Sequence, residues 1–270
     1  MNSVHGGVAE LRGEDARHLA RVLRAEAGQQ YEITDSRAAY LAEIQEVRAG
    51  RVLFRVLERL ESPEPPASIT VLAALIKFDR FEWMIEKATE LGVQRVIPFA
   101  ASRSEKGLAD AAPKRMERWT RIARESSQQS RRLRAPEILP VAQFDACLAE
   151  AADHHYFLEA ANRGATRDPD RLGTQVPSPR ESAVASPSKE CSAPPLLALL
   201  PGARTAGARL ALLVGPEGGW TDAERQLAAR FGWQPASLGP LILRAETATM
   251  AAVGILMNAW ASDGRADPIK

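Results

Sequence analysis

The stretch from residue 209 to residue 224 constrains the fold most, because an apolar strand, a glycine-rich turn and a helix start follow one another in it without a spare residue. Residues 210–214 are uniformly apolar, which is typical of a buried strand. Thr221 and Glu224 have the spacing of a capping box and predict a helix that begins there. The glycines between strand and helix let the backbone approach a ligand and turn N–H groups toward it. A tight connection that binds nothing is equally compatible with this stretch alone.

A second stretch of the same kind, residues 236–249, again joins a short strand to a Gly-Pro turn and a helix start. In a parallel sheet with helical crossovers, loops at the carboxyl ends of neighbouring strands lie side by side, and ligands bind there. We therefore expect both turns to face one pocket, with Arg244 and Glu246 at its mouth. A surface helix cap and an ordinary ion pair are the alternative for these two residues, since surface ion pairs are common and weak.

Four separated segments carry a resemblance to one known family. They are Gly-Pro-Glu-Gly-Gly at 215–219, Leu-Gly-Pro-Leu-Ile-Leu-Arg-Ala-Glu-Thr-Ala at 238–248, Lys77 and Arg80 with Lys-Ala-Thr-Glu-Leu-Gly-Val at 87–93, and Gln-Ser-Arg-Arg at 129–132. On these motifs the chain resembles the ribosomal RNA small subunit methyltransferase E family, the bacterial 16S rRNA uracil-N3 methyltransferases of the SPOUT superfamily. Gln128 stands where the family usually has Glu. The resemblance covers nearly the whole chain except residues 162–204.

A proline-rich segment, residues 61–67, divides the chain, because its three prolines make it stiff and non-helical. The part before it suggests a small β-barrel, since a short helix is followed by short, partly alternating strands, at residues 16–24, 30–34, 39–44 and 51–57 respectively. The resemblance implies that residues 1–62 form a PUA-like RNA-binding domain. Two interpretations of Arg21 and Arg24 are open: they contact RNA, or they are merely solvated on an amphipathic helix whose Leu19, Val22 and Leu23 pack on this barrel.

Strand and helix signals alternate after the linker, which predicts an α/β domain with a largely parallel sheet over residues 68–265. Knots are so rare that topology argues against one, and only the resemblance implies the deep trefoil knot of the SPOUT superfamily. Within this domain, residues 162–204 are rich in Pro, Ser, Ala, Arg and Gly, with few large apolar residues. A segment of this composition builds little core, and we predict a mobile surface insertion there.

A cluster of basic residues between Lys114 and Arg134 says more about partners than the net charge of +1 does. On a helix, Met116, Trp119 and Ala123 fall on one side and most of the cations on the other, so the helix would dock by one face and offer the other to phosphates. A merely solvated basic face is the alternative. With the resemblance, we predict that 16S rRNA within the small ribosomal subunit is the partner, and that the RNA-binding residues are Arg21, Arg24, Lys77, Arg103, Arg124 and Arg132.

The resemblance implies methyl transfer from S-adenosylmethionine to N3 of a uracil, a reaction that requires alignment of donor and acceptor and removal of the N3 proton. It also implies the cofactor-binding residues, which we predict to be Glu159, Val214, Gly215, Pro216, Glu217, Gly218, Gly219, Leu238, Gly239 and Leu243. Arg244 and Glu246 are the candidate catalytic residues, with Arg244 stabilising negative charge on the uracil ring. No residue is singled out as the general base.

Several classes of protein are disfavoured. The amino terminus lacks a signal-peptide pattern and no apolar stretch is long enough to span a bilayer, so we expect a cytoplasmic protein. Two cysteines and four histidines without ligand spacing predict no metal. No Gly-Lys-Ser/Thr follows the glycine-rich turn, which argues against a nucleoside triphosphatase.

The superfamily implies a homodimer. A methyltransferase of the same superfamily with another rRNA or tRNA target, and a non-catalytic RNA-binding protein, remain open as alternatives.

Overall fold

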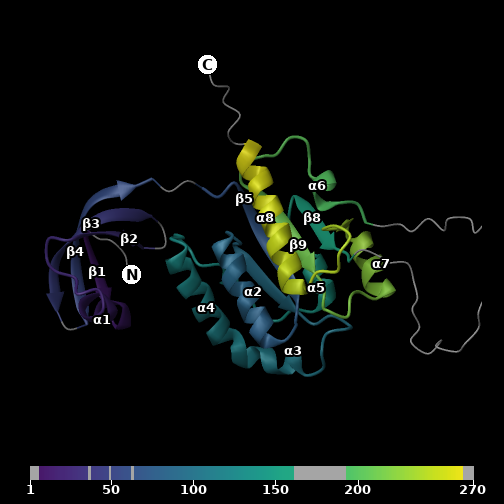
Figure 1. Cartoon of the computed structure of the whole chain (residues 1–270), viewed down its shortest axis with the longest axis horizontal. Helices are drawn as coiled ribbons and strands as arrows, with labels where there is room; N and C mark the ends of the chain where they lie inside the picture. Colours follow the sequence, from purple (N-terminus) through teal and green to yellow (C-terminus); the bar gives the residue numbers. More distant parts are fainter. Residues whose placement is uncertain (1–5, 36–37, 49, 62–63, 161–192, 264–270) are drawn as a thin grey trace, which may run out of the picture.

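The computed structural model describes residues 6–35, 38–48, 50–61, 64–160 and 193–263, and the chain forms two sheets with separate cores (Figure 1). The first sheet is antiparallel with the order β1-β4-β3-β2. The three strands predicted before the linker correspond to β2, β3 and β4, whereas β1 was not predicted. The core of this sheet is formed by residues such as Ile44, Val52 and Phe54. Its elements are β1 (Val8–Arg12), α1 (Glu14–Arg21), β2 (Gln30–Thr34), β3 (Ala39–Arg48) and β4 (Arg51–Leu60).

The end of α1 differs from the prediction. The helix ends at Arg21, and Arg24 has a left-handed backbone with φ of 48°. Leu19 packs against the core of the small sheet, as expected, but Val22 and Leu23 are 64% and 55% exposed. The alternative in which Val22 and Leu23 pack on the sheet with Leu19 is therefore wrong for these two side chains, because the helix stops before they can turn inward.

The second sheet has six parallel strands in the order β10-β8-β9-β5-β6-β7, which confirms the α/β architecture. The chain builds β5, β6 and β7 outward in sequence and then crosses to the other side, where β9 lies between β5 and β8. Such a reversal is where ligands bind in open α/β sheets. The strands are β5 (Ala67–Ala74), β6 (Arg95–Phe99), β7 (Glu137–Ile138), β8 (His154–Leu158), β9 (Ala208–Val214) and β10 (Gln234–Ala236).

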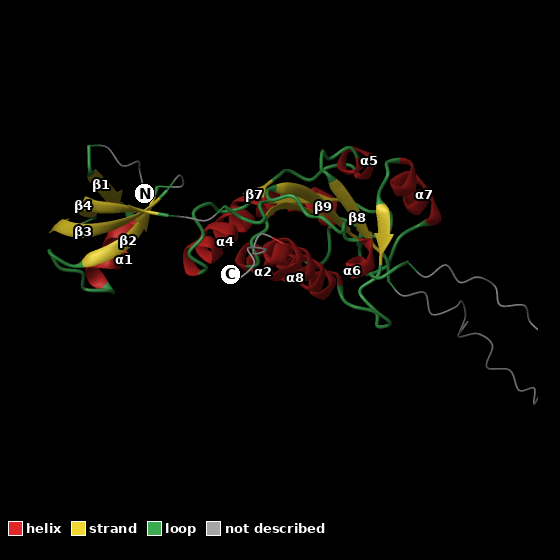
Figure 2. Ribbon diagram, turned by 90° about the horizontal axis from the view of Figure 1, so that it is seen from above, coloured by secondary structure: helices red, strands yellow, loops and turns green. Residues whose placement is uncertain are grey.

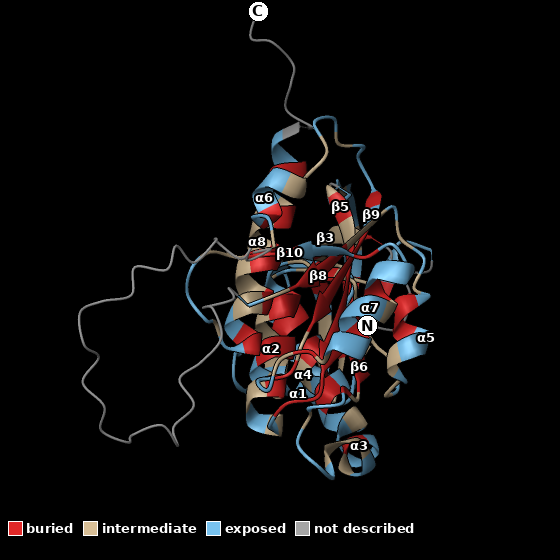
Figure 3. Cartoon of the chain, turned by 90° about the vertical axis from the view of Figure 1, so that its right-hand side faces the viewer, coloured by how far each residue is buried: buried red, intermediate tan, exposed pale blue. Residues whose placement is uncertain are grey.

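Helices cover both faces of this sheet (Figure 2). On one face, α2, α4 and α8 pack over a core that includes Phe81, Trp119 and Leu256; on the other, α5 and α7 cover Phe99, Phe157 and Trp220. The central strands β5 and β9 are almost entirely buried, whereas the edge strands β7 and β10 are partly exposed (Figure 3). The helices are α2 (Phe78–Glu90), α3 (Leu108–Ala111), η1 (Ala112–Arg115), α4 (Met116–Gln129), α5 (Phe144–Leu148), α6 (Leu196–Leu199), α7 (Asp222–Arg230) and α8 (Ala245–Asp263).

Most of the expected insertion, residues 162–192, lies outside the described residues. Its last part forms α6 and buries Leu196 in the core, so that part belongs to the domain. The basic helix ends at Gln129, short of Arg132. The trefoil knot and the domain limits stay predictions. Among the described residues, no helix is long and apolar enough to span a membrane, and no group of three or more His, Cys, Asp and Glu side chains lies together as a metal site would need.

Candidate functional site

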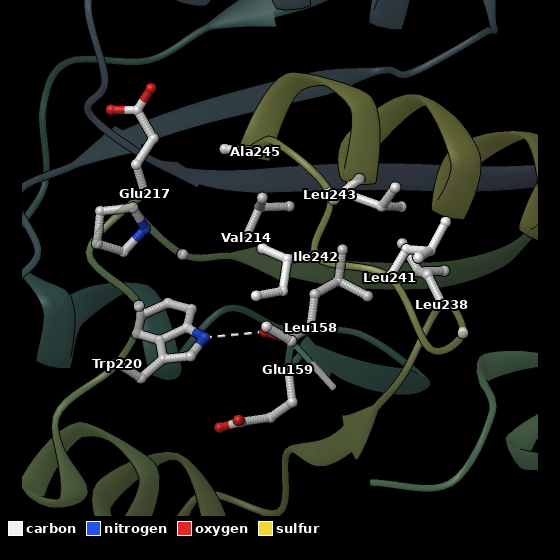
Figure 4. Close-up of a pocket in the computed structure, with 16 residues that line it drawn as sticks. Leu158, Glu159, Val214, Glu217, Trp220, Leu238, Leu241, Ile242, Leu243 and Ala245 are labelled. Carbon is white, nitrogen blue, oxygen red and sulfur yellow. Dashed lines mark hydrogen bonds between the residues drawn. The ribbon is translucent and has the colours of Figure 1, made fainter. Parts of the chain in front are cut away.

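A pocket opens at the carboxyl ends of β8, β9 and β10, where the two glycine-containing loops meet (Figure 4). The loops do face one pocket, but their strands are not neighbours, because β8 lies between β9 and β10 and its end contributes Leu158, Glu159 and Ala160. The pocket has a volume of about 640 Å³, part of it open to solvent.

The pocket wall contains all the predicted cofactor-binding residues except Gly218. The side chains of Val214, Ile242 and Leu243 converge in it, while the carboxylates of Glu159 and Glu217 point to opposite sides (Figure 4). The wall is thus apolar with backbone groups and carboxylates at its edges. Several lining residues were not predicted. Leu158 and Ala160 were missed because the sequence does not show that β8 ends at the pocket, and the others because they belong to the two loops without a pattern of their own: Trp220, Leu241, Ile242, Ala245 and Ala248.

Residue 215 has to be a glycine because an aromatic ring lies against it, and not because its φ has to be positive. A Cβ at this position would lie 2.7 Å from a ring carbon of Trp220. The ring is held in place because its Nε1–H donates to the carbonyl of Leu158 at 2.8 Å and because it stacks on Phe157 with 4.6 Å between ring centroids. The glycine therefore lets Trp220 lie under the turn and join the ends of β8 and β9 at the floor of the pocket.

Gly218 faces away from the pocket, toward the loop after β6. A Cβ on Gly218 would lie 3.0 Å from the Cβ and 3.2 Å from the carbonyl oxygen of Arg103, whose guanidinium donates to the Gly218 carbonyl at 3.1 Å. The nearby Ser102 N–H donates to the carboxylate of Glu224 at 2.8 Å. The position of Gly218 is thus explained by close contact between two loops.

Glu224 fixes these loops as part of the capping box that the sequence predicted. Its carboxylate accepts from the N–H and hydroxyl of Thr221, each at 2.8 Å, while its own N–H donates to the Thr221 hydroxyl at 3.2 Å. Burial alone would raise the pKa of Glu224, but the hydrogen bonds from Thr221 and Ser102 outweigh it and lower that pKa. An ionised, buried carboxylate therefore ties the start of α7 to the loop that carries Arg103.

Arg80, which belongs to one of the motifs but was not predicted as a site residue, links Glu217 of the glycine-rich turn to Glu246 at the start of α8. Neither Arg244 nor Glu246, which were predicted at the pocket mouth, is among the residues that line the pocket. The guanidinium of Arg80 donates to Glu217 and lies 4.0 Å from a carboxylate oxygen of Glu246. Glu246 is 7% exposed, and its second oxygen has no hydrogen-bond partner among the described residues. Arg244 is exposed and makes no ion pair with the described part of the chain. Sequence spacing offers no signal for this grouping.

Glu159 is held at the other side of the pocket by Arg225 of α7, with 2.7 Å between Nε and the carboxylate oxygen. Arg225 also pairs with Asp222 at 3.0 Å. Burial would lower the pKa of Arg225, but these carboxylates raise it. The pair places a fixed carboxylate at the end of β8.

The predicted RNA-binding residues fall into two groups. Arg21, Arg24, Lys77 and Arg124 are exposed and make no ion pair with other described residues, and Arg103 is exposed beside Gly218. Arg132, by contrast, donates to the carbonyls of Thr89, Gly92 and Val93 at 2.7 to 3.5 Å and thereby caps the end of α2. Burial lowers its pKa. We therefore keep Arg132 out of the RNA-binding set proposed below.

Some of the cations on and just before α4 pair with an acidic side chain of α2. Arg118 donates to Glu82 of α2 at 2.8 Å, and Arg115 lies 3.7 Å from the same carboxylate. Trp119 and Ala123 are fully buried on the opposite side, as predicted. Gln128, near the end of α4, lines a hollow of the small domain together with Asp15 and His18.

Comparison with known proteins identifies the family. A family model described as an RNA methyltransferase domain matches residues 63–257, and one described as an RNA methyltransferase PUA domain matches residues 11–57. The ribosomal RNA small subunit methyltransferase E of Bacillus subtilis is 32% identical over 250 residues, which cover 91% of this chain and 88% of the relative. The chain belongs to the ribosomal RNA small subunit methyltransferase E family. The family resemblance read from the motifs is thereby confirmed.

A further relative and two solved structures are similar to this chain over nearly its whole length. The enzyme of that name from Aquifex aeolicus is 27% identical over 94% of this chain and 95% of the relative. A solved methyltransferase E from Neisseria gonorrhoeae, bound to S-adenosylmethionine, has a TM-score of 0.72 at 25% identity, covering 96% of this chain and 95% of that one. A putative methyltransferase from Legionella pneumophila, also solved with S-adenosylmethionine, has a TM-score of 0.73 at 26% identity and 96% coverage of both.

Proposed function

We propose that this protein transfers the methyl group of S-adenosylmethionine to N3 of a uridine in 16S rRNA of the small ribosomal subunit, in the bacterial cytoplasm. The observation that carries the proposal is the pocket that two glycine-containing loops form at the carboxyl ends of β8, β9 and β10, in a chain whose relatives bind this cofactor. The matched PUA domain, a module of RNA methyltransferases, supports an RNA substrate.

The residues of the pocket fit this cofactor. Backbone groups of residues 215–219 and 238–243 offer donors and acceptors, apolar side chains such as Val214 and Leu243 cover its flat and aliphatic parts, and Glu159 and Glu217 suit a ligand with positive charge. When bound, S-adenosylmethionine supplies an electrophilic methyl group on a sulfonium. The loops have to hold it at a fixed angle to the incoming uracil, since alignment is the main contribution of the protein.

Arg244 and Glu246 are the residues that we assign to the uracil side of the pocket. Arg244 is exposed beside the lining residues Leu243 and Ala245, where a guanidinium stabilises negative charge on the oxygens of a uracil that loses its N3 proton. Glu246 is turned toward Arg80 instead of Arg244. We therefore assign Arg244 the direct contact with the base and Glu246 a supporting position.

The RNA-binding surface that we propose consists of exposed cations from several elements. Lys77 lies at the start of α2, Arg103 lies beside Gly218, and Arg124 lies on the exposed face of α4. Arg21 and Arg24 of the small domain extend the set. Long-range attraction of these cations to phosphates strengthens binding without selecting the base, which leaves selection to the pocket.

We also propose that the protein acts as a homodimer. Helix α8 carries apolar residues that are only partly buried, including Met250 and Ile255, and Leu241 and Ile242 beside the pocket are 64% and 68% exposed. Exposed apolar side chains grouped beside a site are typical of a protein interface. Light scattering of the purified protein tests this, with the mass of two chains as the expected result and a single chain contradicting it.

The experiment that tests the function is mass spectrometry of nucleosides from 16S rRNA of a strain that lacks the gene. We expect 3-methyluridine to disappear and to return when the wild-type gene is supplied, but not when it carries Leu243→Trp, which fills the pocket. Persistence of 3-methyluridine in the deletion strain would contradict the assignment. Loss of a different modified nucleoside would favour a methyltransferase with another target, and no loss together with unchanged RNA binding would favour a non-catalytic RNA-binding protein.

A further inference from the structure

Arg80 joins three parts of the chain that are far apart in sequence. It lies in the first turns of α2, its guanidinium donates to Glu217 of the glycine-rich turn, and it lies 4.0 Å from Glu246 in the first turn of α8. The residues of the donated bond are separated by 137 positions. One cation therefore connects the glycine-rich turn, which forms one wall of the pocket, with the start of the helix that follows the second loop.

An ordinary surface ion pair contributes little, but this grouping includes a buried carboxylate. The side chain of Glu246 is only 9% exposed, and one of its oxygens lacks a hydrogen-bond partner among the described residues. A buried charge is costly unless an opposite charge compensates it. The available compensation is the guanidinium of Arg80 and the amino end of α8, which favours an acidic side chain in its first turn.

We propose that Arg80 is a positioning residue of the cofactor pocket, a step that rests on the proposed function. By pairing with Glu217 it holds the glycine-rich turn in the shape that receives S-adenosylmethionine, and by facing Glu246 it fixes that turn relative to the start of α8. Arg80 is not among the residues that line the pocket, so it acts through the residues it holds.

The chemistry of arginine suits this task. Its planar guanidinium presents donors in two directions, so Nη1 serves Glu217 while Nε faces Glu246. A lysine at this position would offer a single point charge on a flexible stem. We therefore expect Arg80→Lys to keep the positive charge but to hold Glu217 and Glu246 less well than the arginine does.

The test measures binding of S-adenosylmethionine by calorimetry, and kcat and the KM for each substrate, in the full-length protein. We expect Arg80→Gln to raise the Kd for S-adenosylmethionine about tenfold and to leave the KM for the RNA unchanged, with Arg80→Lys intermediate. Glu217→Gln should act likewise. Since both residues act as one unit, the double variant should bind no more weakly than either single variant.

The matched control is Arg209→Gln, which removes an exposed ion pair with Asp153 (3.2 Å) at the opposite end of β9 and should leave cofactor binding unchanged. Three results would each overturn the proposal. The first is a double variant whose loss of cofactor affinity is the product of the losses in Arg80→Gln and Glu217→Gln. The others are an unchanged cofactor affinity in folded Arg80→Gln and a change confined to the KM for RNA. If Arg80→Gln fails to fold, Glu217→Gln and Arg80→Lys decide it. A wild-type protein that does not bind S-adenosylmethionine would instead refute the proposed function itself.

Discussion

The indole ring of Trp220 lies so close to the α-carbon of Gly215 that an added Cβ would be 2.7 Å from it. The ring has little freedom to move, because it donates to the carbonyl of Leu158 and stacks on aromatic neighbours on the same face of the sheet. Even a methyl group on residue 215 must therefore displace either the ring or the turn.

Gly215→Ala should lower the free energy of unfolding by about 1–3 kcal/mol, the usual cost of inserting a methyl group into a packed site. It should also weaken cofactor binding, because the turn forms one wall of the pocket. Denaturant unfolding and calorimetry measure the two effects. Gly202→Ala is the control, since a Cβ at residue 202 meets no atom within 4 Å and its φ is not positive. Equal stability of the two variants would contradict the role of the Trp220 contact.

Arg132→Ala should destabilise the fold, and any loss of RNA affinity should follow from that loss of stability. The variant leaves the carbonyls of Gly92 and Val93 without a donor and removes one of the two donors to the Thr89 carbonyl, which keeps the N–H of Gly92. Unsatisfied, partly buried acceptors cost about 1–3 kcal/mol. Thermal unfolding measures the loss. Arg121→Ala, which removes only an exposed contact of 3.8 Å with Glu125, should change the free energy of unfolding by less than about 1 kcal/mol. Unchanged stability of Arg132→Ala would return this residue to the RNA-binding candidates.

The local signals in the sequence predicted most elements because each depends on neighbouring residues. The capping box of Thr221 and Glu224 marks the start of α7, and the apolar run before it marks β9, whatever the rest of the chain does. The glycine-rich turn could therefore be placed at the end of a buried strand from sequence alone. The same locality explains why the strand β2 was predicted with its observed bounds.

What the sequence did not predict depends on the order in which distant strands pair. The position of β8 between β9 and β10 brings Leu158 to the pocket floor, and no periodicity encodes that order. The grouping of Arg80 with Glu217 and Glu246 is likewise a tertiary contact. Arg132 was assigned to a basic helix face because its charge was visible in the sequence, whereas the carbonyls that it caps were not.

Stability should depend on pH through Glu224. Its pKa is lowered in the folded protein from 4.5, so the stabilisation by its carboxylate is fully present above about pH 4.5 and is lost as the pH falls through the lowered pKa. Glu224→Gln should therefore be less stable than the wild type at pH 7, and the difference should shrink under acid conditions. Unfolding curves between pH 3 and pH 8 measure it. Glu105→Gln, on an exposed loop, serves as control, and a difference that grows on acidification would contradict the role of Glu224.

Arg124 should contribute to RNA binding through charge alone. It is exposed on α4 and makes no ion pair with the described residues, so its guanidinium is available to a phosphate. Arg124→Ala should weaken binding of a 16S rRNA transcript severalfold at low salt and reduce the slope of log affinity against log salt concentration by about one, because one phosphate contact fewer releases fewer counterions. Arg209→Ala, which removes a cation at the far end of β9, should leave the slope unchanged. If Arg124→Ala lowers affinity equally at all salt concentrations, the residue acts through the packing of α4 and does not bind phosphate.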